Sequence, residues 1–187
     1  MAFWGGQGNA MVDPKRSFRW LVTFGTKHNK LHDWYAKSAN KPSFTVGETP
    51  HRFVNHTFFY PGRVEWQTID IVLVDPAREN DSSLALMQSL QESGYYNPTD
   101  PLSATSTITK RNAVKALGGQ IFLKQLGQDR NDIVETWTLI NPWIKDIKFG
   151  DLNYESEDMV EITLTVRYDF ATLTAGVPTK TASTPKK

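Results

Sequence analysis

The chain has 187 residues and a mass of 21.2 kDa, a length typical of one domain with extensions rather than of two catalytic domains. It contains no cysteine, which excludes disulfides, thiolate zinc sites and cysteine nucleophiles. Its 21 basic and 20 acidic residues give a net charge of +1, so no overall field attracts nucleic acid or anionic lipid. We expect no secretion signal and no membrane anchor, because the apolar runs are far shorter than the roughly 20 residues that cross a bilayer.

The charge is uneven along the chain. Residues 1–60 carry eight bases and three acids, a net charge of +5, whereas residues 61–169 carry ten bases and 17 acids, a net charge of −7. Such asymmetry is typical of two solvated faces. It equally suits head-to-tail contact between copies of the chain.

The two ends of the chain differ in composition from its middle. Residues 1–14 are rich in glycine and predict an N-terminal arm, and residues 172–187 are rich in Thr, Ala, Pro and Lys and predict a low-complexity tail. We expect a β domain over residues 15–171. Neither end buries enough apolar area to offset its backbone entropy, so we expect both to be ordered by a neighbouring subunit, with Phe3 and Trp4 as anchors.

Strand signals dominate the middle of the chain. Enrichment in β-branched and aromatic residues predicts strands over residues 18–24, 54–60, 64–74, 120–126 and 133–140. The pair Pro61-Gly62 predicts a turn between the second and third of these strands. The polar residues 127–132 predict a hairpin between the last two.

The segment over residues 38–62 predicts an extended arm or hairpin. Prolines interrupt it, and its aromatic side chains are costly on the surface of a monomer but natural at an interface. We therefore expect Phe53, Phe58, Phe59 and Tyr60 to contact a neighbouring subunit. The alternative is a hairpin folded back on its own core.

One segment follows a helical rather than a strand period. Either Asn80 or Asp81 can cap a helix, Leu84, Met87 and Leu90 recur at intervals of three, and Gly94 can end it. A mainly β body with a single packed helix predicts a two-sheet β-sandwich or a partly closed barrel.

The strand signal is clearest near the C-terminus, where apolar and polar residues alternate with a period of two. The apolar set, which we expect to face the core, is Val160, Ile162, Leu164, Val166 and Tyr168. The polar set on the opposite face is Glu161, Thr163, Thr165 and Arg167.

The sequence predicts no catalytic, cofactor or metal site. His28 and His32 have the four-residue spacing of two ligands on one helix face, but no third ligand stands at a recognisable distance from them. Surface or packing histidines are the favoured interpretation. We therefore expect a protein that is not an enzyme.

An alternative from another functional class is a carbohydrate-binding or carbohydrate-cleaving β-sandwich. Six tryptophans supply rings that could stack on sugars, and acids gather at Asp151, Glu155, Glu157 and Asp158. The same acids could also suggest a calcium loop, but they lack its alternating ligand order and central glycine. A polar hairpin turn is the favoured interpretation of this cluster.

Two stretches resemble the tail tube protein of contractile-tailed bacteriophages. They are VNHTFFYPGRVEWQTIDIVLVDP at residues 54–76 and ETWTLINPWIKDIKFGDLNYESEDMVEITLTVRYDFA at residues 135–171. The second contains a strand, a turn at Asn141-Pro142-Trp143, a Gly-x-Leu-x-Tyr segment, an acidic turn and a closing strand. The order and spacing of these elements carry the resemblance.

The resemblance implies a structural subunit that assembles into stacked, six-membered rings. The inner strands of neighbouring subunits would join into one barrel around a lumen, inside a contractile sheath, and genomic DNA would leave through that lumen without specific binding. The implied partners are further copies of the chain, the sheath protein, and the baseplate and tail-terminator proteins. The implied location is the tail tube of a virion assembled in the host cytoplasm.

The polar face of the closing strand is the candidate for the lumen wall. Its acid and hydroxyl groups at Glu161, Thr163 and Thr165 would repel phosphate or leave it unbound, although Arg167 makes the face less acidic. Ordinary solvent exposure explains such a face equally well. A close alternative to a phage tail is the tube of a phage-derived contractile injection system, since nothing in the sequence separates the two.

Overall fold

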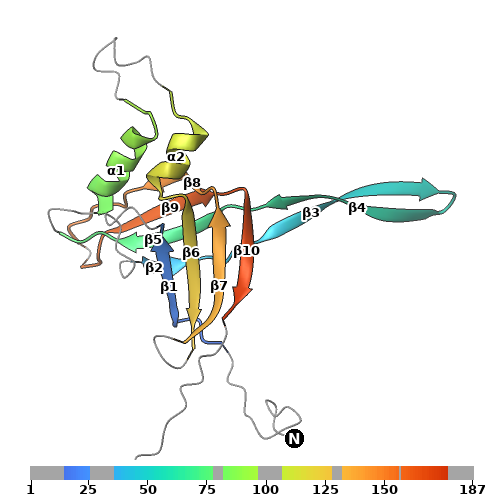
Figure 1. Ribbon diagram of the computed structural model, residues 1–187, viewed down its shortest axis with the longest axis horizontal. Coiled ribbons are helices and arrows are strands. Elements are labelled where there is room, and N and C mark those ends of the chain that lie inside the picture. Colours follow the sequence, from blue (N-terminus) through green and yellow to red (C-terminus); the bar gives the residue numbers. More distant parts are fainter. Residues whose placement is uncertain are drawn as a thin grey trace, which may run out of the picture.

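The computed structural model of the protein describes residues 15–25, 36–77, 82–96, 107–127, 132–155 and 157–176. Two four-stranded antiparallel sheets form the body, with two helices on one side and a long two-stranded arm projecting from the other (Figure 1). The mainly β, two-sheet architecture expected from the sequence is confirmed. Each sheet has open edges in the single chain.

The strands pair in the following order. The first sheet, ordered β1-β6-β7-β10, consists of β1 (Trp20–Phe24), β6 (Gln120–Leu126), β7 (Ile133–Ile140) and β10 (Phe170–Ala175). The second sheet, ordered β2-β5-β9-β8, consists of β2 (Ala36–Ala39), β5 (Ile69–Val74), β9 (Glu161–Arg167) and β8 (Trp143–Lys148). The arm is the pair β3 (Phe44–Phe53) and β4 (His56–Trp66), and the helices are α1 (Ser82–Glu92) and α2 (Lys110–Ala116).

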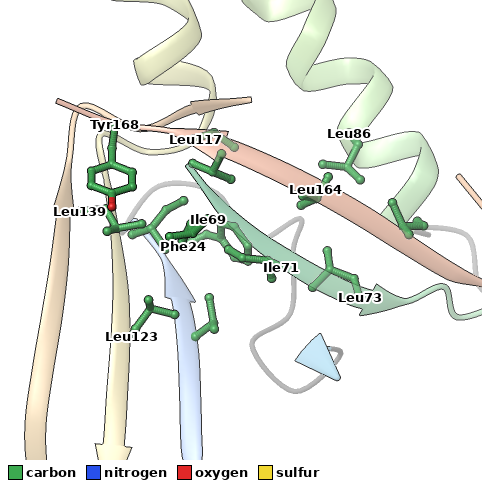
Figure 2. Close-up of a cluster of buried hydrophobic side chains, with 14 of the residues drawn as sticks. Phe24, Ile69, Ile71, Leu73, Leu86, Leu117, Leu123, Leu139, Leu164 and Tyr168 are labelled. Carbon is green, nitrogen blue, oxygen red and sulfur yellow. The ribbon is translucent and has the colours of Figure 1, made fainter. Parts of the chain in front are cut away.

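The core lies where the two sheets cross. Strand β9 alternates between buried and half-buried positions along its whole length, as its sequence predicts, and Ile162, Leu164 and Val166 are fully buried. Tyr168 follows them into the core, whereas Val160 is only partly buried. Figure 2 shows Leu164 facing Leu86 of α1, so helix and sheets share one apolar cluster.

The structure has two helices in its described part, so the expectation of a single helix is wrong. Helix α1 forms where the helical period predicts it, and Gly94 follows it with a φ of 107°, in the left-handed region that favours glycine. Helix α2 escaped prediction because its seven residues bury only Ala113 and Ala116. Its N-terminus is capped by Thr109, whose hydroxyl accepts a hydrogen bond from the backbone N–H of Asn112 at 3.3 Å.

The expectation of a turn at Pro61-Gly62 is also wrong, because β4 runs through both residues. The chain reverses instead at Val54-Asn55, between β3 and β4. The strand register shifts beside Gly62, where a Cβ atom would lie 3.1 Å from the carbonyl oxygen of Gly47. Pro61-Gly62 therefore marks a bulge, where the two backbones approach closely. Proline and glycine occur at bulges within strands as well as in turns between them.

The C-terminal boundary of the β domain lies beyond residue 171. Strand β10 pairs with β7 from Phe170 to Ala175, so residues 172–175, assigned from composition to the tail, belong to the first sheet. Residues 172 and 174 are threonines, and threonine is common both in strands and in low-complexity tails. Composition alone therefore did not distinguish a strand from a tail here. The tail from residue 177 onward and the N-terminal arm over residues 1–14 lie outside the described residues.

A buried carboxylate ties separate parts of the chain to the first sheet. Glu135 on β7 is 6% exposed and forms ion pairs with Lys15 and Lys41. Burial raises the pKa of the Glu135 carboxyl, but the hydrogen bonds from the two lysines outweigh burial and hold the pKa below its ordinary value. The chain before β1 and the connection between β2 and β3 are both anchored at this point.

Candidate assembly surfaces

The arm projects from the body instead of folding back on it. All ten residues of β3 are exposed, and at about 3.3 Å per residue the arm reaches about 33 Å, roughly the diameter of a small domain. Figure 1 shows that it continues the line of β5 away from both sheets. The alternative of a hairpin packed on its own core is therefore excluded.

One face of the arm continues the core. Trp66 lies 6.0 Å from the buried ring of Tyr168 and 5.2 Å from the ring of Phe44, measured between ring centroids. Further along the same face, Val46 pairs with Val64, and both are exposed. Farther out, this face carries the cross-strand pairs Glu48 with Pro61 and Pro50 with Phe59. We call this surface the core-side face of the arm; it is apolar except for Glu48 and, nearest the tip, the pair Arg52 with Thr57.

The opposite face of the outer arm carries aromatic rings and two histidines. Three of the four aromatic residues expected at an interface, Phe53, Phe58 and Tyr60, lie here, and the fourth, Phe59, lies on the core-side face. His51 contacts Tyr60 edge to face with 6.5 Å between ring centroids, and His56 contacts Phe58 with 4.6 Å. These rings contact one another, but the described part of the body does not cover them, because β3 and β4 contact mainly each other.

The tip of the arm combines exposure with backbone strain. Val54 has a φ of 51°, a conformation that β-branched residues rarely adopt, and its side chain is 85% exposed. Glycine or asparagine would form this turn with less strain. Strain retained by an exposed apolar residue points to a role outside the isolated protomer.

The polar face of β9 points away from the core, as expected from its alternation. Thr165 donates a hydrogen bond from its hydroxyl to Asp70 on β5 at 2.6 Å, and Glu161 forms an ion pair with Lys37 on β2. Arg167 lies 3.6 Å from Glu65, at the base of the arm. The structure thus gathers Glu161, Thr163, Thr165 and Arg167 on one half-buried sheet face where acids and bases are mixed. Their assignment to a lumen stays a prediction.

An apolar groove lies between the helices and strand β8. Figure 1 shows these helices above the left part of the body, away from the arm, which leaves to the right. Its volume is about 440 Å³, and its apolar lining includes Met87, Leu90, Ile108, Trp143, Ile147 and Phe149. Strand β8 is an edge strand of the second sheet. The sequence held a partial signal for this groove in the recurrence of Leu84, Met87 and Leu90. Met87 and Leu90 line the groove, whereas α1 buries Ala85 and Leu86.

Asp169, at the corner between β9 and β10, joins helix α2 to the sheets. The ammonium of Lys110 donates to its two carboxylate oxygens at 2.6 and 2.8 Å, and the Asn141 amide donates to it at 2.9 Å. The hydrogen bond from Lys110, followed by that from Asn141, lowers the pKa of the Asp169 carboxyl. These bonds hold α2, one wall of the groove, in place.

The other candidate residues fall in different places. Phe3, Trp4, His28 and His32 lie outside the described residues. The acids Asp151, Glu155, Glu157 and Asp158 are exposed on the loop between β8 and β9, which also presents Leu152 and Tyr154 to solvent. Within the described ranges, no three His, Asp or Glu side chains gather as metal ligands do. None of the described helices has the length and apolarity of a membrane span.

Comparison with known proteins identifies the fold. No protein-family model matches the sequence, and no curated protein matches it. Among solved structures, a chain of the tube-terminating cap of the anti-feeding prophage is similar, with a TM-score of 0.68 and 14% identity over 94% of this chain and 100% of the other. A chain of the sheath/tube terminator of the extracellular contractile injection system PVC has a TM-score of 0.65 and 13% identity, covering 89% of this chain and 100% of the other.

A third similar structure comes from the sheath–tube complex of the same PVC injection system. Its TM-score is 0.60, with 16% identity over 87% of this chain and 92% of the other. In each of these comparisons the similarity covers most of both chains. The chain therefore has the fold found in these components of contractile injection systems.

Proposed function

From the fold shared with tube, terminator and baseplate components of contractile systems, we propose that this protein is a structural subunit of a tail tube. Copies of the chain assemble into stacked rings, and the rings form the inner conduit of a contractile tail. The main observation that supports this proposal is the arm, a two-stranded extension whose apolar side chains the protomer itself leaves uncovered. Its partner must therefore come from outside the protomer.

The position of the arm supports a closed ring. The groove is lined by α1, α2 and β8. Figure 1 shows the two helices above the left part of the body and the arm leaving to the right, so a contact of arm with groove is head to tail rather than self-complementary. Repeated head-to-tail contacts close into rings when the rotation between copies divides a full turn. Six copies per ring is the number that the resemblance to phage tail tubes implies.

The open sheets support a barrel that runs around the ring. Each four-stranded sheet ends in edge strands, β1 and β10 in one and β2 and β8 in the other. Pairing between edges of adjacent subunits would satisfy these backbone groups and remove a surface prone to aggregation. Phe53, Phe58, Phe59 and Tyr60 add side-chain contacts between subunits, and Phe3 and Trp4 extend those contacts through the N-terminal arm.

The polar face of β9 is the proposed lumen wall. Glu161, Thr163 and Thr165 offer acids and hydroxyls, and Arg167 is engaged with Glu65. Such a face holds phosphate weakly, which suits passage of genomic DNA without specific binding. A tube of this kind needs no catalytic residue and no cofactor. Its partners are the sheath, baseplate and terminator proteins of the same particle, a phage tail or a phage-derived injection system.

A tube terminator is the second candidate. The cap of the anti-feeding prophage and the PVC terminator resemble this chain with TM-scores of 0.68 and 0.65, against 0.60 for the chain from the sheath–tube complex. A terminator forms one ring and ends growth, whereas a tube subunit stacks without limit. The two therefore differ in whether both surfaces of the ring can bind another ring.

Electron microscopy of the purified full-length protein tests the proposal. Long tubes of uniform width support the tube subunit, single rings that do not stack support the terminator, and a particle that stays monomeric at high concentration contradicts both. The lumen is tested with Thr163→Cys, since the chain has no other cysteine. A gold-labelled maleimide should appear on the tube axis, and label on the outer wall would contradict the lumen assignment.

A further inference from the structure

Two surfaces of the protomer expose apolar side chains and could therefore cover each other. One is the core-side face of the arm, where Val46, Val64 and Phe59 are 44%, 55% and 62% exposed. The other is the groove between α1, α2 and β8, whose rim residues Met87 and Ile108 are 38% and 48% exposed. Side chains of this kind are normally covered in the working form of a protein.

The two features cannot meet within one protomer. Figure 1 shows the arm leaving one side of the body and the helices standing on the other. Among the described residues, Trp66 and Glu65 at the base of the arm contact the body. A second copy placed head to tail, however, brings its groove to the side from which the arm projects.

The core-side face has the chemistry that the groove accepts. It extends the apolar inner face of the second sheet beyond the point where the first sheet and the helices stop covering it. The groove is floored by Ile144 and Ile147, which belong to the same sheet face in β8. Docking an arm there adds apolar side chains to an existing apolar layer and places a strand near the open edge of β8.

We propose that the groove between α1, α2 and β8 receives the arm of a neighbouring copy, with Phe59 of the arm against Met87 and Ile108 of the groove. This inference rests on the self-assembly in the proposed function and names the receiving site on the partner. The contact is heterologous, because arm and groove lie on different sides of the body, so the copy that receives an arm directs its own arm to a third copy. Val54 at the tip, strained and exposed, lies beyond Phe59 and makes the far end of the same contact.

Cysteine cross-linking in the full chain tests the contact directly, because the natural sequence has no cysteine. The variant with both Phe59→Cys and Met87→Cys should form a ladder of disulfide-linked oligomers under mild oxidation. A mixture of the two single variants should stop at linked dimers, since each copy then has only one reactive side. The matched control pairs Phe59→Cys with Phe18→Cys, an aromatic position that is 72% exposed and does not line the groove, and should give no ladder.

Charge substitutions test whether the contact drives assembly. Phe59→Asp in the arm and Met87→Asp in the groove should each weaken self-association by about tenfold or more in sedimentation velocity. Circular dichroism should show both variants folded, because both side chains are exposed in the protomer. Phe18→Asp should associate as the unchanged protein does.

The outcomes separate this inference from the proposed function. Tubes without a Phe59–Met87 cross-link, together with normal tubes from Met87→Asp, would overturn the groove as the receiving site and leave the tube subunit standing. A cross-linked ladder without rings or tubes would support the groove and contradict the tube. Absence of both cross-link and assembly at high concentration would overturn both.

Discussion

Strands β9 and β3 differ in how far the protomer buries their side chains. Along β9 every second residue is buried, and the covering layers come from the first sheet and α1. Along β3 all ten residues are exposed, although Phe44, Val46 and Phe53 are as apolar as their counterparts in β9. The protomer therefore covers β9 and leaves β3 uncovered, and substitutions in the two strands should separate stability from assembly.

The largest contrast is expected between a charge in the sandwich and a charge in the arm. Leu164→Asp places an unpaired carboxylate among fully buried side chains, which should cost on the order of 5 kcal/mol and abolish folding. Phe59→Asp in the arm should leave the melting temperature nearly unchanged. Circular dichroism and thermal melts check both, and a soluble, folded Leu164→Asp protein would contradict the assigned core.

The buried ion-pair cluster tests how far the stability of the body depends on chain segments outside the sheets. Replacing both Lys15 and Lys41 by Met leaves the Glu135 carboxylate buried without its cations. We expect a loss of about 2 kcal/mol, less than for a fully buried pair because both lysines are half exposed. Urea unfolding measures the change. Adding Glu135→Gln to the double variant should recover part of it.

The same cluster predicts how stability depends on pH. The pKa of Glu135 is lower in the folded chain than its ordinary value of 4.5, so its stabilising contribution is complete above that value and is lost as the pH falls through the folded pKa. The stability of the natural protein should therefore fall more steeply below about pH 5 than that of Glu135→Gln. Parallel slopes for the two proteins in urea unfolding would contradict the effect.

A substitution at the tip of the arm should stabilise the turn in the monomer and weaken tube formation. Val54→Gly removes a β-branched residue from a φ of 51° and should stabilise the turn by about 1 kcal/mol. Amide exchange of Phe53 and His56 should slow in the monomer, while tube formation weakens because an exposed apolar contact is lost. Faster exchange in the variant would show that the turn is not strained.

The smallest effect is expected at the corner that holds α2. Lys110→Met removes the ion pair with Asp169, which is partly exposed, and should cost about 0.5 kcal/mol. The pKa of Asp169 should rise toward its ordinary value, since the hydrogen bond from Lys110 is the first cause of its lowering. NMR titration of the Asp169 carboxyl measures this. Lys145→Met on β8 is a control that should leave the pKa of Asp169 unchanged.

The sequence by itself determined the elements whose side chains follow a simple period. Strands β6 and β7 begin and end where β-branched enrichment places them, and the alternation of β9 assigns Ile162, Leu164 and Val166 to the core. These signals are local, because the period of a strand is set by its own backbone. The aromatic segment around residues 58–60 was likewise predicted to lie outside the core, and Phe58, Phe59 and Tyr60 are exposed, whereas their contact with a neighbouring subunit stays a prediction.

Only the tertiary structure decided features that depend on residues far apart in sequence. Pro61-Gly62 became a bulge rather than a turn because Gly47, on the opposite strand, lies close enough to exclude side chains. Composition assigned residues 172–175 to a tail, but pairing with β7 makes them a strand. The groove exists because α1 turns Leu86 inward and leaves Met87 facing the edge of β8, and no pattern within the helix shows what lies opposite it. Local periodicity specifies which faces are apolar, whereas the packing of distant segments determines which of those faces are covered.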